Sequence, residues 1–482
     1  MKIAFFNPQG NFDAKDSHWT SHPDFGGQLV YVREVAIAMA KMGTDVDIIT
    51  RKIEDPGWPE FVSEFDYYKN IDGVRIVRIN FGGKKFLPKE KLWPYLKDYV
   101  KGIEAFYISE KKMPDFITTH YGDGGISGAL FSSKTNIPYS FTAHSLGAQK
   151  MDKLQITGGN FDEIDAKYNF STRIAAERIA MKYSAFNAVS TSMERFEQYS
   201  HKLYEKWINV KDDSKFRIIP PGVNLSIFNS KECADDRMVE KKLNKTLSEH
   251  SDRKRVNLPL ITLSSRIDPK KNQISALKAY ASDKWLKKNA NLLIVVRGMK
   301  NVYEEYKKAN NFEKGVLKEL VSFIEENNLK DKVFFFDANG QNELSSLYRI
   351  LSKKGSIFCN IALYEPFGLS IIEAMACGLP VVATKNGGPS EILEESGQNY
   401  GILVEPENFQ SISNGFKILL KNKQRYEKYK KTGIERVVSN YTWESTAKEY
   451  LRAIEEKLSV SYETPKVPEY FLFGKLAPKL EF

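Results

Sequence analysis

Short apolar runs alternate with longer stretches in which apolar residues recur at helical spacing, and this alternation extends over most of the chain. A short apolar run predicts a buried strand, whereas apolar residues three and four positions apart predict an amphipathic helix. Strands separated by helices form parallel sheets built from βαβ units. In the first 220 residues the pattern predicts strands at 3–6, 46–50, 74–79, 116–120, 139–144, 185–190 and 217–220.

The same pattern begins again after Pro220-Pro221-Gly222, a sequence that interrupts regular structure. The charged stretch 231–255 predicts a solvated helix, and 443–458 predicts another near the C-terminus. We expect two Rossmann-like, doubly wound α/β domains, residues 1–221 and 222–440, with a C-terminal helix within 441–482 joining the first. The strands predicted for the second domain are 260–264, 292–297, 333–337, 356–361, 381–384 and 401–404.

The composition is that of a folded protein. Of 482 residues, 42% are hydrophobic and 27% are charged, which excludes a disordered chain and a collagen-like repeat. The three cysteines lie far apart, as in a protein of a reducing compartment, and form neither a disulfide framework nor a zinc cluster. The apolar runs are too short for a signal peptide or a membrane-spanning helix, so we expect a cytoplasmic protein with no membrane partner.

The formal net charge is +10. Such an excess is typical of proteins that bind nucleic acid, membrane surfaces or small anions. The basic residues are interspersed with acidic ones and include no basic tract or aromatic RNA-reading signature. We therefore expect no nucleic-acid partner, and a basic nucleic-acid-binding protein stays the less favoured alternative. The sequence identifies no protein partner.

Polar motifs in the first half lie where predicted strands and helices meet. Gly27 and Gln28 open a predicted helix, where backbone N–H groups and the helix dipole favour an anion, although a flexible helix entrance has the same sequence. His120 and His144 end predicted strands in glycine-containing runs, as ligand-contacting or structural histidines do. No histidine pair has the spacing of zinc ligands, so we expect no metal.

Charged residues follow two predicted strands of the second half. Arg266 and Lys271, placed after strand 260–264, can neutralise a departing diphosphate, or they belong to an exposed basic turn. Glu365 and Glu373 follow strand 356–361, and carboxylates of this kind accept hydrogen bonds from sugar and ribose hydroxyls. A glycosidase pair or negative charge at a helix start are the alternatives. Residues 386–389 form a second glycine-rich helix entrance.

Taken in order, the runs 264–272, 365–373 and 386–389 resemble the donor-site series of the retaining, nucleotide-sugar-dependent glycosyltransferases. Those enzymes have the GT-B fold, in which two Rossmann-like domains face a central cleft. The runs 7–10, 23–32, 119–124 and 144–150 look like those of the bacterial sucrose-phosphate synthases. The likeness covers almost the whole chain apart from the last few tens of residues. Ala143 and Leu363 depart from the family pattern and leave the choice of donor open.

This resemblance implies an acceptor domain followed by a donor domain. The implied reaction is transfer of glucose from UDP-glucose to fructose 6-phosphate, with retention, to give sucrose 6-phosphate and UDP without a cofactor. A mannosylfructose-phosphate synthase that uses GDP-mannose and a sucrose synthase that uses unphosphorylated fructose are the alternatives.

The resemblance also implies roles for individual residues. Arg266 and Lys271 correspond to diphosphate ligands, and Glu373 corresponds to a ribose ligand. The implied catalytic residues are His144, Arg266, Lys271 and Glu365. The implied donor-binding residues are Gly27, Arg266, Lys271, Glu365, Phe367, Gly368, Leu369 and Glu373. The implied acceptor-binding residues are Gly27, Gln28, His120 and three cations for the phosphate, Lys89, Lys150 and Arg173.

Overall fold

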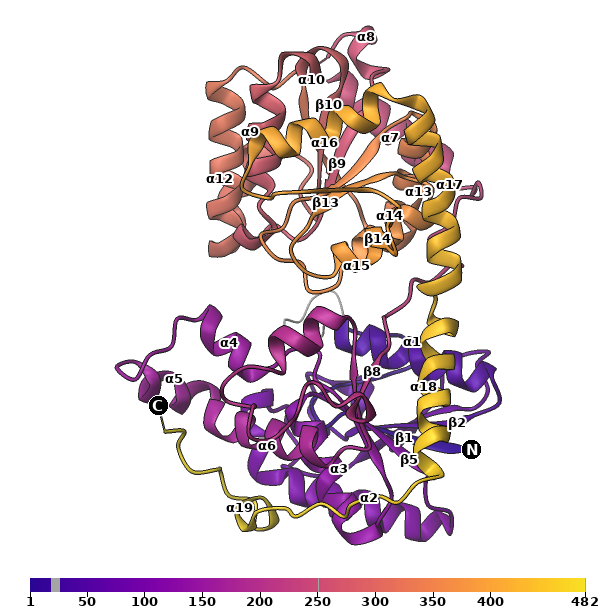
Figure 1. The fold of residues 1–482 in the computed structure, drawn as a ribbon, viewed down its shortest axis with the longest axis vertical. Coiled ribbons are helices and arrows are strands. Elements are labelled where there is room, and N and C mark those ends of the chain that lie inside the picture. The colour runs from indigo at the N-terminus through magenta and orange to yellow at the C-terminus, as the bar shows by residue number, and fades with distance from the viewer. Residues whose placement is uncertain (19–26, 250, 482) are drawn as a thin grey trace. The chain divides into compact units, whose positions relative to one another are not determined.

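A computed structural model describes residues 1–18, 27–249 and 251–481 (Figure 1). The chain divides into two compact units. Unit 1 comprises Met1–Pro220 and Trp443–Phe482, and unit 2 comprises Pro221–Thr442.

Unit 1 is built on an eight-stranded sheet of order β3-β4-β2-β1-β5-β6-β7-β8, in which only β3 is antiparallel to its neighbour. The strands are β1 (Lys2–Phe6), β2 (Asp45–Arg51), β3 (Phe65–Asp66), β4 (Val74–Ile79), β5 (Phe116–His120), β6 (Tyr139–Thr142), β7 (Phe186–Val189) and β8 (Phe216–Ile218). The α-helices are α1 (Gly27–Lys41), α2 (Leu96–Glu110), α3 (Tyr121–Thr135), α4 (Gly147–Lys153), α5 (Phe161–Tyr168), α6 (Phe170–Tyr183), α18 (Trp443–Leu458) and α19 (Glu469–Leu472).

Helices cover both faces of this sheet, because its central strands are apolar on both sides. Along β1, Ile3 and Phe5 belong to the apolar cluster that α1 and α18 complete. Ala4 and Phe6 belong to the opposite cluster, completed by α2 and α3. All four side chains are fully buried, as expected for a parallel sheet enclosed between helices.

Unit 2 contains a six-stranded, fully parallel sheet of order β11-β10-β9-β12-β13-β16, together with a two-stranded hairpin. The sheet strands are β9 (Leu260–Ser264), β10 (Asn291–Val296), β11 (Val333–Asp337), β12 (Ile357–Asn360), β13 (Val381–Thr384) and β16 (Ile402–Val404), and the hairpin pairs β14 (Glu394–Glu395) with β15 (Gln398–Asn399). The helices are α7 (Asp236–Ser248), α8 (Arg253–Val256), α9 (Gln273–Ser282), α10 (Lys284–Asn289), α11 (Val302–Glu305), α12 (Asn311–Glu326), α13 (Gly340–Lys353), α14 (Leu369–Ala376), α15 (Pro389–Leu393), α16 (Phe409–Lys421) and α17 (Lys423–Asn440).

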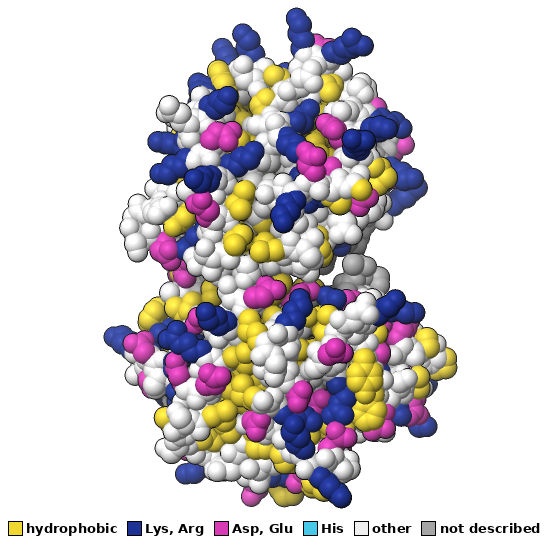
Figure 2. Space-filling model, turned by 90° about the vertical axis from the view of Figure 1, so that its right-hand side faces the viewer, with side chains coloured by type: hydrophobic (Ala, Val, Ile, Leu, Met, Phe, Trp, Pro, Cys, Tyr) yellow, Lys and Arg dark blue, Asp and Glu magenta, His cyan; other side chains and the backbone are white. Residues whose placement is uncertain are grey.

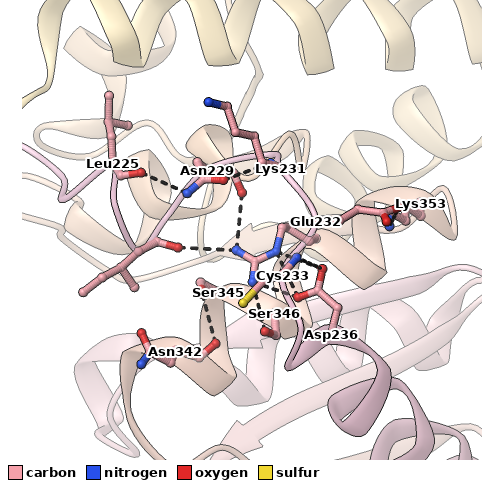
Figure 3. A network of polar contacts seen from close by, with 12 residues as sticks. Leu225, Asn229, Lys231, Glu232, Cys233, Asp236, Asn342, Ser345, Ser346 and Lys353 are labelled. Carbon is pink, nitrogen blue, oxygen red and sulfur yellow. Dashed lines mark hydrogen bonds and ion pairs between the residues drawn. The ribbon is translucent and has the colours of Figure 1, made fainter.

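A buried arginine fastens the beginning of unit 2 to its sheet-covering helices. Arg349 on α13 donates to both carboxylate oxygens of Asp236 on α7, at 2.8 to 3.1 Å. Its remaining nitrogen faces the carbonyl oxygens of Ile227 and Asn229, each at 3.4 Å. Figure 3 shows this network of polar contacts, with Asn229 and Asp236 labelled. The Arg349 side chain is 4% exposed, and a charge this buried needs such a complete set of partners.

The predicted strands are confirmed, with differences at their ends. Strand β6 stops at Thr142 instead of 144, because His144 has a φ of 54°, which a strand cannot contain. The charged stretch predicted as one helix forms two, α7 and α8. The helix 443–458 is confirmed as α18, whereas no sequence pattern indicated the four-residue α19.

Candidate functional site

Both sheets place their polar motifs where the strand order reverses. In a doubly wound sheet this reversal opens a crevice at the carboxyl ends of the two central strands, and ligands bind there. In unit 1 the reversal lies between β1 and β5, and in unit 2 it lies between β9 and β12. Four of the motifs that the sequence singled out follow β1, β5, β9 and β12, and those at His144 and at 386–389 follow the adjacent strands β6 and β13. Each unit therefore has polar motifs at its own reversal.

In unit 2 the two motif loops are joined by an ion pair. Lys271 Nζ, after β9, lies 2.6 Å from Glu365 Oε2, after β12. The amide of Asn360 donates to the same oxygen at 3.1 Å, and Glu365 is 8% exposed. Arg266 is exposed, and among the described residues no carboxylate lies within ion-pair distance of its guanidinium. The sequence indicated these groups separately; the contact between Lys271 and Glu365 was not predicted.

The glycine-rich turn after β13 fits against the loop that carries Glu365. Glu365 N donates to Asn386 O at 3.1 Å, and Gly388 N donates to Glu365 O at 2.9 Å. A Cβ on Gly387 would lie 2.1 Å from Glu365 O, and one on Gly388 would lie 2.4 Å from Phe367 O. The glycines of this motif therefore permit contact between two backbones, which places Phe367 and the start of α14.

Gly368 and Leu369 begin α14, and Glu373 lies one turn further along. Gly368 has a φ of 116°, and Leu369 is exposed. Burial among apolar groups raises the pKa of the Glu373 carboxyl to about 8. A carboxyl in this state gains from partners that stabilise its charged form, and the vicinal hydroxyls of a ribose are partners of that kind.

In unit 1 the two histidines that end β5 and follow β6 contact each other. His120 Nδ1 lies 2.9 Å from His144 Nε2, and His120 Nε2 lies 3.3 Å from Thr118 Oγ1. The Tyr31 and Tyr121 rings pack around His144, at centroid distances of 5.0 and 5.5 Å. His120 is 1% exposed, so it lies behind His144 and holds that ring in place.

Burial keeps both imidazoles neutral. It lowers the pKa of His144 to about 3 and lowers the pKa of His120 well below its usual range, with a smaller effect from His144. A neutral imidazole has one donor and one acceptor nitrogen, so the tautomer of His120 sets which role remains for His144 Nδ1.

The helix entrance of unit 1 also lies at the sheet reversal. Gln28 Nε2 donates to Asn7 Oδ1 at 3.2 Å, which joins the start of α1 to the end of β1. Gly27, the first residue of α1, is exposed, with open space where a Cβ would be. The preceding part of the motif, residues 23–26, lies outside the described residues.

Arg173 belongs to a buried network that shapes the loop after β6. Its Nε donates to Glu177 Oε1 at 2.8 Å, and one terminal nitrogen donates to the carbonyl oxygen and hydroxyl of Ser145. Glu177, which is 1% exposed, also accepts the N–H of Gly147 at 3.0 Å and the hydroxyl of Tyr204. Glu177 therefore fixes both Arg173 and the start of α4. The sequence did not predict this role.

Residues 168–173 span the end of α5, Asn169 and the first turn of α6, which contains Arg173; we call them the α5–α6 junction. Lys150 Nζ on α4 lies 5.0 Å from the centre of the Tyr168 ring. Asn169 Nδ2 donates to Glu90 O at 2.9 Å, and Glu90 belongs to the short helical turn Lys89–Lys91. The junction therefore carries Arg173, contacts Lys150 and bonds to the turn that contains Lys89, although the sequence positions of the three cations gave no sign of this.

Asp123 lies near Arg173 and Lys89, and no ion pair joins it to Arg173 within the described part of the chain. It is 5% exposed, and burial raises the pKa of its carboxyl to about 7, against the opposing effect of Arg173 and Lys89. Among the described residues its Oδ2 has no hydrogen-bond partner.

The described part of the chain contains no cluster of three or more histidine, cysteine or acidic side chains able to hold a metal ion. Within the same residues, no helix has both the length and the apolar character needed to cross a membrane. Figure 2 shows lysine and arginine side chains scattered among acidic ones on the face in view, rather than gathered in one basic patch.

Comparisons with known proteins identify the class. Residues 1–248 match the family described as sucrose synthase, first GT-B domain, and residues 244–436 match glycosyl transferases group 1. A solved sucrose-phosphate synthase from Thermosynechococcus elongatus aligns with a TM-score of 0.67 at 24% identity, covering 95% of this chain and all of the other. An Anabaena protein solved with UDP-glucose aligns with a TM-score of 0.57 at 16% identity, with coverage of 95% and 100%. The fold is that of the GT-B glycosyltransferases, and the protein is a hexosyltransferase.

The particular family follows from sequence. A probable sucrose-phosphate synthase from Thermosipho melanesiensis is 49% identical over 473 residues, which are 98% of this chain and 99% of the relative. The chain belongs to the sucrose-phosphate synthase family. The sucrose-phosphate synthase of Spinacia oleracea is 30% identical, and the match covers 89% of this chain but only 45% of that longer protein.

Proposed function

We propose that this protein transfers glucose from UDP-glucose to fructose 6-phosphate with retention of configuration. Membership of the sucrose-phosphate synthase family supports the reaction class. The observation that supports a phosphorylated acceptor is that the α5–α6 junction of unit 1 carries Arg173, contacts Lys150 and bonds to the turn that contains Lys89. A phosphate dianion needs several charge-assisted donors, and plain fructose offers nothing for them to bind.

Unit 2 holds the donor in this proposal. Arg266 and Lys271 bind the diphosphate, Glu373 binds the ribose, and Glu365 with the backbone at the start of α14 binds glucose hydroxyls. Since Lys271 is paired with Glu365, a diphosphate that attracts the ammonium group frees carboxylate lone pairs for the sugar. Lys271 then pairs with the diphosphate and Glu365 with the sugar hydroxyls, so that neither charge is buried without a partner.

Unit 1 holds the acceptor. Gln28 and Gly27 lie at the sheet reversal for the fructose ring, the three cations bind its phosphate, and His144 contacts the transferred sugar. We assign His120 to positioning His144, because it is buried behind that ring.

The reaction breaks the bond between glucose C1 and the diphosphate oxygen and forms a bond from C1 to the acceptor hydroxyl oxygen. The departing diphosphate takes the hydroxyl proton on the same face of the sugar, so configuration is retained. The cations of unit 2 neutralise the charge that grows on the leaving oxygen. Burial lowers the pKa of His144 to about 3, so its imidazole is too weak a base to compete for the proton.

A donor-by-acceptor matrix tests this proposal. UDP-, ADP- and GDP-sugars are each offered with fructose and with fructose 6-phosphate, and the disaccharide product is measured directly. We expect kcat/KM for UDP-glucose with fructose 6-phosphate to exceed that with fructose at least about a hundredfold, as two charge-assisted contacts imply. Equal values would favour a sucrose synthase, and preference for GDP-mannose would favour the mannosyl enzyme.

A further inference from the structure

The segment after α18 runs along the surface of unit 1 and ends beside α5 (Figure 1). We call residues 462–481 the C-terminal strap. Ser132 Oγ on α3 donates to the Tyr462 hydroxyl at 3.3 Å. Phe471, which is 4% exposed, belongs to the apolar cluster of α2 and α3. The strap is therefore anchored to the body of the unit in its first half.

A glycine then lets the strap turn. Gly474 has a φ of 68°, and a Cβ at this position would lie 2.4 Å from Pro94 O. Lys97 Nζ donates to the carbonyl oxygen of Phe473 at 3.2 Å. Only glycine fits this close, left-handed position, and this turn sets the direction in which residues 475–481 continue.

The end of the strap binds the first turn of α6. Ala477 N donates to Thr172 Oγ1 at 3.1 Å, and Leu480 N donates to Ser171 Oγ at 3.0 Å. The Leu480 side chain packs against the apolar cluster that contains Phe170. Lys479 adds an exposed ion pair with Asp162 of α5.

Ser171 and Thr172 belong to the α5–α6 junction and directly precede Arg173. Other bonds at this junction include those of Ser171 with Asp165, of Asn169 with Glu90 and of Arg173 with Glu177. Ser171 and Thr172 are thus bonded to the C-terminal strap, which lies more than 300 residues further along the sequence.

We infer that the C-terminal strap is a positioning element for the acceptor phosphate. By binding Ser171 and Thr172, it fixes the α5–α6 junction, which carries Arg173, contacts Lys150 and bonds to the turn that contains Lys89. This inference rests on the proposed function. Without the strap the junction loses two backbone donors and an apolar contact, and the cations become less well placed for a shared phosphate.

The test uses a chain that stops after Lys475, which keeps the Tyr462 and Phe471 anchors. Thr172→Val is the second variant, because it removes the acceptor of the Ala477 N–H and preserves side-chain shape. Lys479→Ala is the matched control, since an exposed ion pair contributes little. For each protein we would measure KM and kcat with fructose 6-phosphate, KM with fructose, UDP affinity by calorimetry, and thermal unfolding.

We expect the truncation to raise KM for fructose 6-phosphate about tenfold, because several weak contacts are lost. Thr172→Val should raise it about threefold, because one hydrogen bond is lost. The kcat value, KM for fructose and UDP affinity should stay within about twofold of wild type, and Lys479→Ala should match wild type. An unchanged KM for fructose 6-phosphate would overturn the inference, and so would equal losses for both acceptors. A wild-type enzyme with no phosphate preference would instead overturn the proposed function.

Discussion

The buried histidine pair should make unit 1 sensitive to acid. In the folded protein, burial lowers the pKa of His144 to about 3 and that of His120 well below its usual range. In the unfolded chain both titrate near about 6.5. Between these values the unfolded chain binds protons that the folded chain does not. The free energy of unfolding contributed by the pair is therefore complete above about pH 6.5 and is lost as the pH falls toward 3.

The size of the effect follows from that window. Each pH unit below the unfolded pKa costs about 1.4 kcal/mol per neutral histidine, so His144 costs about 2 kcal/mol at pH 5. His120 adds to the loss in the same direction. The loss from His144 alone is already a substantial part of the stability of about 5–15 kcal/mol that folded proteins have. In urea it corresponds to a midpoint shift of about 1 M.

The assay is urea unfolding at pH 7 and pH 5, followed by tryptophan fluorescence. All tryptophans except Trp285 belong to unit 1, so the signal reports chiefly on that unit. The variant His120→Asn/His144→Gln should lose the extra acid sensitivity, whereas Tyr31→Phe, which keeps an aromatic ring beside the pair, should retain it. Comparison with the variant is needed because raised carboxyl pKa values act in the opposite direction. The reasoning fails if wild type and the double variant lose equal free energy between the two pH values.

Three further outcomes test unit 2. Glu373→Gln should raise the free energy of unfolding of the ligand-free protein at about pH 8 but not at about pH 4.5, and urea unfolding measures this difference. The reason is that burial raises the pKa of Glu373 in the folded protein to about 8, so that ionising this carboxyl costs stability as the pH rises from 4.5 to 8. The same variant should bind UDP less tightly in calorimetry, and unchanged affinity would exclude a ribose contact. Arg266→Ala should lower kcat/KM about a hundredfold without changing the melting temperature, whereas Lys271→Ala should lower both, because it leaves Glu365 buried without its cation. Equal melting temperatures for these two variants would contradict the role given to the ion pair.

Much of the fold could be predicted because strand identity is a local property. A strand buried on both faces is a short apolar run whatever its neighbours are, so β4, β5, β9, β11 and β13 were predicted to the residue. The left-handed conformation of His144 is not local in this sense. It depends on the bonds that hold the loop after β6, and these come from Arg173 and Glu177 on α6.

The same reason explains which site residues the sequence could not reveal. Glu177 lies in an ordinary helical pattern, and its importance arises only because Gly147, Tyr204 and Arg173 converge on it. Pro465, Pro468 and Pro478 predict an irregular tail, yet two of its backbone N–H groups bond to side chains on α6. Hydrogen bonds of this kind leave no periodicity in the sequence that contributes the donors.

Glu177 has two effects at the α5–α6 junction, and they oppose each other only in appearance. Its buried carboxylate pairs with Arg173 and so removes one positive charge from the surroundings of the proposed acceptor phosphate. In return it fixes the Arg173 side chain, which would otherwise have to be ordered by the ligand. Asp123, which lies near Arg173 and Lys89, adds no second negative charge when it is protonated: burial raises its pKa to about 7, and an arriving anion favours its protonated form further. For the proposed acceptor phosphate, the geometry of Arg173 is therefore set before binding, and the nearby carboxyl that could repel the phosphate is readily neutralised.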